Sequence, residues 1–260
     1  MFNFLIDAGV NLTNAQFNNE YDEIIARANA AHVKSMLIIG CDIQSSEHAL
    51  ELALKHQLFC TAGIHPHDAK SATDKLETQL STLANNKHVI AIGECGLDYN
   101  RDFSPRDVQR SVFRRQLALA EKLNLPVYLH ERDATDDMLM ILNEFNVRGV
   151  LHCFTGNADA LKSYLDLGLY IGITGWICDE RRGLALQELL PSIPLERLLI
   201  ETDAPFLIPR TITPKPKSRK NEPALLPYVC QTVAKLYNID TKTVAHYTSK
   251  NFYQLFNLEM

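Results

Sequence analysis

Residues 89–94 read VIAIGE, an apolar run that ends in a carboxylate, and the same pattern returns three times further along the chain. The later stretches are PVYLH at 126–130, GVLH at 149–152 and LLIETD at 198–203. Nearly continuous apolar runs are typical of strands that are buried on both faces of a parallel sheet. Each run ends in a side chain that can bind a metal: Glu94, His130, His152 and Asp203.

Short apolar runs alternate with amphipathic stretches along the whole chain. The runs span Phe2–Asp7, Ser35–Cys41, Leu58–Ile64, Val89–Glu94, Pro126–His130, Gly149–Cys153, Leu169–Thr174 and Leu198–Asp203. Helical patterns lie between them, such as SPRDVQRSVFRRQLALAEKLN at 104–124, for which Ser104 is the predicted N-cap. Eight alternations without a composition break predict an α/β fold, a TIM (β/α)8 barrel that forms a single domain over residues 1–260.

An open, doubly wound sheet is the competing architecture. Such a sheet usually carries a glycine-rich phosphate turn after its first strand. The corresponding stretch at 7–12 reads DAGVNL, which is not a G-x-G-x-x-G motif. The barrel is therefore favoured.

Composition and charge are those of an ordinary soluble protein. The chain has 260 residues, 46% hydrophobic residues and a net charge of -5, so a polyanion would need a local basic patch. Six cysteines without a C-x-x-C pair favour reduced thiols and a cytoplasmic location. The start, MFNFLIDAG, is too short and too poor in basic residues for a signal peptide or a membrane span. Nothing demands an obligate protein partner, so we expect a monomer.

The four run-terminal side chains predict one metal site. In a barrel, the carboxyl ends of the strands meet at the catalytic face. A single histidine is more often a hydrogen-bonded core residue, and we put its prior as a ligand at roughly one in ten. Four metal-competent groups in equivalent positions raise that far above even odds. The pattern indicates metal-assisted hydrolysis at Glu94, His130, His152 and Asp203.

Residues near these run ends suggest supporting roles. GIHPHD at 63–68 is either a rigid turn with two exposed imidazoles or a substrate contact, with His65 better placed than His67 to touch a phosphate or orient a water. Asp98 is expected to support a ligand histidine. Strand alternation points Cys95 and Cys153 away from the site, and the chain has no G-x-S-x-G motif typical of serine hydrolases.

Two basic loops follow the seventh and eighth runs. GWICDERRG at 175–183 carries Arg181 and Arg182. PRTITPKPKSRKNEP at 209–223 carries Arg210, Lys215, Lys217, Arg219 and Lys220 against the single Glu222. A basic loop is usually a solvated surface segment, but the prolines and the position beside Asp203 favour phosphate binding without base reading. Trp176 is expected either to stack on a base or to pack in the rim.

Several long motifs occur in order along almost the entire chain: GIHPH, AIGECGLDYNR, PVYLHERDA, LHCFTG, YIGITGW, LIETDAPFLIPR and RKNEP. With these motifs the sequence resembles the TatD family of metal-dependent deoxyribonucleases. The ICDERRGL and TPKPKSRKNEP loops narrow the resemblance to one branch of that family.

The resemblance implies a cytoplasmic, metal-dependent barrel that hydrolyses the phosphodiester bonds of nucleic acid. It implies a magnesium-dependent 3′-5′ exonuclease that prefers single-stranded DNA or RNA and takes part in the repair of oxidative DNA damage. The metal ligands of the family map onto Glu94, His130, His152 and Asp203, the residues that the run ends select independently.

One departure from the family pattern bears on the metal count. Many members carry an H-x-H pair after the first strand, where this chain has Gly9 and Asn11. We therefore expect one firmly held cation at Glu94, His130 and His152, and a second that is weaker or arrives with substrate. The second position keeps mainly oxygen ligands, which suits Mg²⁺, whereas imidazole ligands favour Mn²⁺ or Zn²⁺.

In the expected mechanism, Asp203 is the general base and Glu94 holds or bridges the metals. Arg181, Arg182 and the Lys215–Lys220 loop, including Arg219 and Lys220, anchor neighbouring phosphates. An amidohydrolase-like enzyme, including a deacylase acting on charged tRNA, could use the same metal site. A barrel that only binds nucleic acid or a partner is the third alternative, which the loss of two histidines keeps open.

Overall fold

The structure is a computed structural model that describes residues 3–214 and 218–259. Strands in these residues are β1 (Leu5–Val10), β2 (Val33–Ile38), β3 (Phe59–Ala62), β4 (Val89–Asp98), β5 (Val127–Arg132), β6 (Gly149–Leu151), β7 (Tyr170–Ile173) and β8 (Leu198–Ile200). The α-helices are α1 (Tyr21–Ala30), α2 (Ile43–His56), α3 (Leu76–Ala84), α4 (Arg106–Leu123), α5 (Thr135–Leu142), α6 (Ala158–Asp166), α7 (Leu184–Leu189), α8 (Leu226–Tyr237) and α9 (Thr241–Phe256). Short 3-10 helices are η1 (Ala15–Phe17), η2 (Pro66–Ser71), η3 (Gly175–Cys178), η4 (Leu190–Ser192), η5 (Leu195–Arg197) and η6 (Pro223–Leu225).

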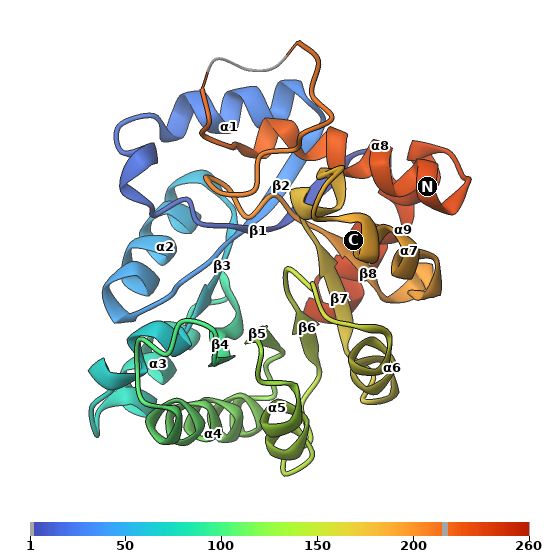
Figure 1. The fold of residues 1–260 in the computed structure, drawn as a ribbon. Coiled ribbons are helices and arrows are strands. Elements are labelled where there is room, and N and C mark those ends of the chain that lie inside the picture. The colour runs from blue at the N-terminus through green and yellow to red at the C-terminus, as the bar shows by residue number, and fades with distance from the viewer. Residues whose placement is uncertain (1–2, 215–217, 260) are drawn as a thin grey trace. The chain divides into compact units, whose positions relative to one another are not determined.

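The described strands form one sheet in the order β1 to β8, with helices between successive strands (Figure 1). The neighbours β3–β4, β4–β5, β5–β6 and β7–β8 pair in parallel. The last strand, β8, also contacts β1. Parallel strands in chain order, joined by helices and with the first beside the last, confirm the predicted TIM (β/α)8 fold.

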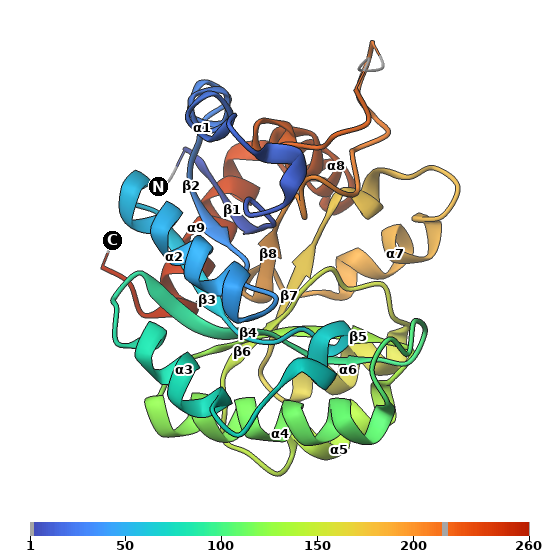
Figure 2. The ribbon, with the colours of Figure 1, turned by 90° about the vertical axis from the view of Figure 1, so that its left-hand side faces the viewer.

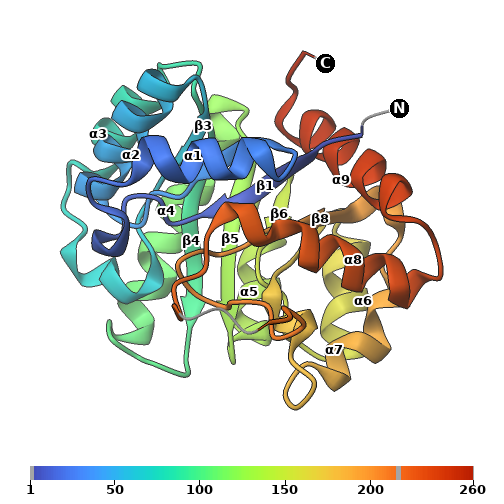
Figure 3. The same ribbon diagram turned by 90° about the horizontal axis from the view of Figure 1, so that it is seen from above.

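Two compact units divide the described residues. The first comprises the described parts of Met1–Leu37, Cys153–Leu165 and Tyr170–Met260, and the second comprises Ile38–His152 and Asp166–Leu169. In the second unit, helices α3, α4 and α5 lie below strands β4 and β5 in the view of Figure 2. In the first, α8 and α9 pack against β1 and β8 (Figure 3).

Strand β4 is the longest of the described strands and pairs with both β3 and β5 in the second unit. All of its residues are buried, as expected for a strand covered on both faces. It extends to Asp98, so Glu94 lies inside the strand. The sequence pattern predicts Glu94 at the end of the strand, and this prediction is wrong. His130 likewise lies inside β5, whereas His152 directly follows β6 and Asp203 follows β8 by three residues.

Strand β1 begins later than predicted, and Phe2 lies outside the described residues. It continues past Asp7, whose side chain is fully buried. A carboxyl group can lie inside this strand because it accepts hydrogen bonds from the backbone N–H and the hydroxyl of Thr202.

The predicted N-cap of α4 is wrong. The cap residue is Pro105, and the hydroxyl of Ser104 instead donates to the carbonyl oxygen of His67 at 2.8 Å. The Ser104 hydroxyl thus forms a tertiary hydrogen bond with His67 and not the helix cap that the local sequence predicts.

Candidate metal centre

Glu94 stands at the centre of an imidazole cluster in the second unit. Its Oε1 lies 3.3 Å from Nε2 of His65, 2.9 Å from Nδ1 of His130 and 3.0 Å from Nε2 of His152. His65 caps η2 directly after β3, His130 comes from β5, and His152 follows β6. Neighbouring parallel strands therefore deliver three ring nitrogens to one carboxylate oxygen.

The Glu94 carboxyl group is only 5% exposed, and burial and the neighbouring imidazoles shift its pKa in opposite directions. Burial by itself raises the pKa of Glu94, but the adjoining rings of His152, His65 and His130 outweigh it and hold that pKa well below its usual range. Burial also lowers the pKa of His65 to about 4. At neutral pH Glu94 is thus ionised and His65 is neutral, which are the protonation states that bind metals.

Asp98 supports the cluster from the far end of β4. Its Oδ2 lies 2.7 Å from Nε2 of His67 and 3.3 Å from Nε2 of His130, and its side chain is buried. Burial opposes ionisation of Asp98, but the hydrogen bonds from His130, His67 and the backbone N–H of Arg101 hold its pKa far below the usual range. This contact matches the support of a ligand histidine that we expected of Asp98.

The GIHPHD turn at 63–68 does not carry two exposed imidazoles, which is one of the two alternatives that the sequence leaves open. His65 is 8% exposed and faces Glu94, and His67 is half-buried against Asp98. The rings of His65 and His130 meet edge to face with centroids 4.4 Å apart. Its position makes His65 part of the metal-competent cluster. The substrate contact predicted for His65 stays a prediction.

The donor set fits a divalent cation. The ligand atoms of His65, Glu94 and His130 all lie within 4.8 Å of one another. One carboxylate and several imidazoles are common ligands of divalent transition metals. His130 turns one ring nitrogen to Glu94 and the other to Asp98, the pattern by which carboxylates orient metal-binding histidines.

Asp203 belongs to the first unit, where it forms hydrogen bonds with Gly9 and Asn11. These two residues occupy the positions at which many family members carry the H-x-H pair. Asn11 donates from Nδ2 to Oδ1 of Asp203 at 2.8 Å, and the backbone N–H of Asp203 donates to the carbonyl of Gly9 at 2.9 Å. Of the four predicted ligands, the second unit brings together Glu94, His130 and His152. That Asp203 joins them stays a prediction.

Cys41 is a neighbour of the cluster that the sequence interpretation missed. Its thiol lies 3.8 Å from Oε2 of Glu94, whereas His65, His130 and His152 lie near Oε1. The available signal was that Cys41 ends the second apolar run, just as Glu94 ends the fourth. Cys95 is fully buried inside β4, in keeping with its predicted structural role.

The basic residues have different surroundings. Arg181 and Arg182 are both well exposed and lie beside the buried Asp179. Arg219 is exposed, whereas Lys220 forms an ion pair with Glu20 at 2.8 Å. The remaining predicted lysines, Lys215 and Lys217, lie outside the described residues.

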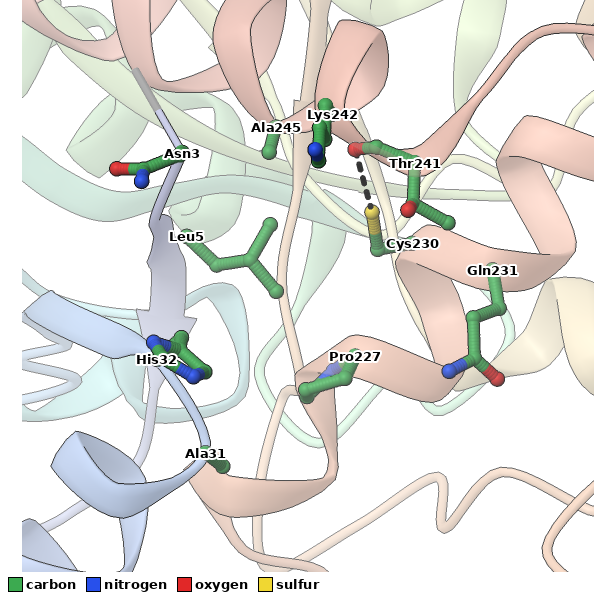
Figure 4. Close-up of a pocket in the computed structure, with 10 residues that line it drawn as sticks. All are labelled: Asn3, Leu5, Ala31, His32, Pro227, Cys230, Gln231, Thr241, Lys242 and Ala245. Atoms are coloured by element: carbon green, nitrogen blue, oxygen red, sulfur yellow. Dashed lines mark hydrogen bonds between the residues drawn. The ribbon is translucent and has the colours of Figure 1, made fainter.

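A cavity of about 290 Å³ lies elsewhere in the first unit (Figure 4). It is lined by Leu5 at the start of β1, by His32 after α1 and by residues of α8 and α9 such as Cys230 and Lys242. Cys230 donates from its thiol to the carbonyl of Thr241, as Figure 4 shows. Gly9 and Asn11 hold Asp203 at the opposite end of β1, so this cavity is separate from the Asp203 environment.

Two observations bear on the expected setting of the protein. All six cysteines are free of disulfide bonds in the structure. Among the residues that the structure describes, no helix combines the length and the apolar character needed to cross a membrane.

Comparison with known proteins confirms the fold and the family resemblance. The family model described as TatD related DNase matches residues 6–257. A Klebsiella pneumoniae protein named 3′-5′ ssDNA/RNA exonuclease TatD is 49% identical over 261 residues, which cover 98% of this chain and 99% of that protein. A Salmonella typhimurium protein of the same name is 48% identical over 258 residues, with the same coverage.

Solved structures agree over the same extent. A TatD homologue from Escherichia coli K12 superimposes with a TM-score of 0.90 and 27% identity, covering 100% of both chains. A hydrolase TatD family protein from Entamoeba histolytica gives a TM-score of 0.89 and 26% identity, covering 98% of both chains.

Proposed function

We propose a function for this chain from its membership of the TatD-related DNase family. The chain hydrolyses phosphodiester bonds and removes nucleotides from the 3′ end of single-stranded DNA or RNA. The names of relatives that are 48–49% identical over nearly their full length support this polarity and these substrates. The observation that carries the proposal is the Glu94 carboxylate with its three imidazole neighbours.

The cluster around Glu94 would hold the firmly bound cation, with His130, His152 and His65 as its other ligands. A divalent cation supplies a Lewis acid that polarises a phosphoryl oxygen and lowers the pKa of a water molecule. We propose Mg²⁺ as the cation, with Mn²⁺ and Zn²⁺ as the alternatives that an imidazole-rich donor set favours. A second cation is weaker or arrives with substrate.

The other residues position substrate and move the proton. Asp203, oriented by Asn11, is the proposed general base that takes the proton of the attacking water. Arg181, Arg182 and Arg219 are exposed and can bind phosphates next to the scissile one. Lys220 can do so only after its ammonium group leaves Glu20.

We also infer the setting of this activity. The match of one family model to residues 6–257 supports one catalytic domain. Six free cysteines support a reducing compartment and hence a cytoplasmic location. A monomeric state and a role in the repair of oxidative DNA damage stay predictions.

The test is hydrolysis of 5′-end-labelled single-stranded DNA and RNA with Mg²⁺, Mn²⁺ or Zn²⁺, with and without a chelator. We expect a ladder that shortens from the 3′ end only when metal is present. Glu94→Gln should lower the rate by more than about 100-fold, because even residues that merely support metal ligands change activity by about 10- to 100-fold.

Glu144→Gln is the matched control, since Glu144 is an exposed carboxylate paired with Arg114 in the same unit. Equal loss in both variants, or full activity of Glu94→Gln, would contradict the site. Model esters and charged tRNA in the same assays separate the amidohydrolase-like alternative. Binding of strands without any metal-dependent cleavage would instead favour the non-enzymatic alternative.

A further inference from the structure

A second pocket, of about 200 Å³, opens between the loops that follow β7 and β8 in the first unit. The loop after β7 contributes Trp176 and Arg182 to its lining, and the loop after β8 contributes Leu207, Ile208 and Arg210. Pockets for drug-sized ligands measure about 300–1,000 Å³, so this space suits a smaller group such as a single planar ring.

The two loops are held together by a close backbone contact that only glycine allows. A Cβ atom on Gly175 would lie 1.9 Å from the carbonyl oxygen of Leu207. Leu207 follows Asp203, the proposed base, by four residues of the same loop. The pocket is therefore connected through a short stretch of chain to the proposed catalytic group.

One wall of the pocket is a stacked pair of planar groups. The Arg182 guanidinium lies 4.5 Å above the centroid of the Trp176 ring, and Nε of Arg182 lies 3.0 Å from Oδ2 of Asp179. The Asp179 side chain is almost fully buried, whereas that of Arg182 is 58% exposed. Arg182 is thus held by Asp179 and Trp176 while more than half of its side chain stays open to solvent, and nucleobases stack on such arginine planes.

Arg210 also lines the pocket, and its guanidinium group forms an ion pair with Glu180. Arg210 forms a forked pair with Glu180, with Nε 2.9 Å from Oε2 and Nη2 2.8 Å from Oε1. The Glu180 side chain is 61% exposed and that of Arg210 is 34% exposed. Such an exposed pair contributes little to stability, and a phosphate offers the same two-oxygen geometry as the carboxylate.

We propose that this pocket is a nucleotide subsite of the single strand, in which a base stacks on the Arg182–Trp176 pair and the backbone phosphate binds Arg210 in place of Glu180. This inference rests on the proposed function only for the identity of the ligand. Glu180 acts as a built-in competitor that phosphate must displace. The local charge favours this exchange, because the ion pairs among the described residues set three arginines, Arg181, Arg182 and Arg210, against the two carboxylates of Asp179 and Glu180.

The first test measures strand affinity with the full chain, its divalent metal and an oligonucleotide whose 3′ linkages are phosphorothioates that slow cleavage. Glu180→Gln should tighten the Kd about two- to fivefold, the range expected when an exposed ion pair no longer competes. Arg210→Gln should weaken binding and reduce the slope of log Kd against log salt by about 0.7, the change expected for one lost phosphate contact on a single strand.

Glu144→Gln is again the matched control. It removes an exposed carboxylate from a forked pair with Arg114, whose side chain is 35% exposed, and it changes the net charge of the chain equally. The Kd of this variant should stay that of the wild type. Equal Kd values for Glu180→Gln and Glu144→Gln would overturn the proposal.

The second test uses the fact that Trp176 is the only tryptophan in the chain. Binding of a strand with bases should quench or shift its emission, whereas a strand of abasic nucleotides should bind through phosphates and leave the emission nearly unchanged. Identical responses to both strands would overturn the stacking. DNA and RNA versions of each strand show whether the subsite distinguishes the sugar.

The two proposals can fail separately. If the wild-type chain cuts strands but none of these variants changes the Kd, the subsite is wrong and the nuclease function stands. If the variants behave as expected but no metal supports cleavage, the nuclease function is wrong and the strand-binding pocket stands.

Discussion

At the scale of single residues, the chemistry of the site depends on how a buried carboxylate is kept charged. Burial of an isolated carboxylate is costly, and a protein must surround it with donors or cations. Glu94 has three imidazoles at 2.9–3.3 Å, and Asp98 fixes one of them from the other side. A divalent cation bound there would supply positive charge directly to this carboxylate.

The role of His65 can be decided by its metal dependence. We expect His65→Ala to raise the metal concentration for half-maximal activity by at least about 10-fold, because its Nε2 lies beside Glu94 Oε1. A metal titration at saturating strand measures this. His67→Ala, which touches Asp98 and not Glu94, should shift the titration less. An altered KM with an unchanged metal titration would support the substrate contact predicted for His65 and contradict its role as a metal ligand.

Asp7 should make stability depend on pH. Burial raises its pKa to about 7, against an ordinary 3.8, although Thr202 and Gly9 donate hydrogen bonds to it. The folded state therefore keeps a proton that the unfolded state releases. As pH rises from about 4 to 7 the folded state loses stability relative to the unfolded state, by up to a few kcal/mol, and above pH 7 no more is lost.

Asp7→Asn removes this titration and keeps an acceptor for the backbone N–H groups. The Tm of the variant minus that of the wild type should be larger at pH 8 than at pH 5, as measured by thermal unfolding at both values. A difference in Tm that is the same at both pH values would show that Asp7 has an ordinary pKa.

At the scale of elements, the approach of β4 to β5 places Glu94 and His130 within reach of each other. The register between the strands shifts between Ile92 and Cys95, where Gly93 has a φ of 145°. A Cβ atom on Gly93 would lie 2.3 Å from the carbonyl oxygen of Tyr128. Only glycine fits both the conformation and the space at this position.

Gly93→Ala should therefore destabilise the chain by roughly 3 kcal/mol or more, since strain and a backbone clash add. Gly168→Ala is the matched control, because Gly168 also has a positive φ of 78° but no atom within 4 Å of an added Cβ. It should cost only about 1–2 kcal/mol, the conformational strain without a clash. Chemical denaturation compares the two free energies of unfolding, and equal losses would contradict the argument from close approach.

Element ends show where sequence patterns are weak. Ser104 has the residue type of an N-cap, yet its hydroxyl donates to His67 and α4 begins after Pro105. Asp7 interrupts an apolar run, yet β1 continues through it because Thr202 satisfies the carboxyl group. In both cases a residue distant in sequence, His67 or Thr202, bonds to the polar side chain. Local sequence propensity contains no information about such a partner.

At the scale of the whole molecule, metal binding should be coupled to unfolding. A cation that binds only the folded chain stabilises it by about 2.7 kcal/mol at one hundred times its Kd, or roughly 5–10 °C in Tm for a chain of this size. After treatment with a chelator, we expect Zn²⁺ or Mn²⁺ to raise the Tm more than Mg²⁺ at equal concentration, because imidazoles prefer those ions.

Thermal unfolding of the wild-type chain and of Glu94→Gln tests this coupling. The metal-dependent rise should vanish in the variant, since Glu94 is the group that all three imidazoles share. A rise of the same size in the variant would place the stabilising cation elsewhere.

The sequence by itself determined the alternation of strands and helices, and it selected Glu94, His130 and His152, which the second unit brings together. It could do so because strands buried on both faces must be largely apolar, so a histidine or carboxylate that ends an apolar run stands out, even where the strand itself continues beyond it. Only the tertiary structure showed that His65 and Cys41 also face Glu94, and that Asn11 holds Asp203. These contacts depend on strand register and on loops that meet in space, and neither leaves a periodic signal along the chain.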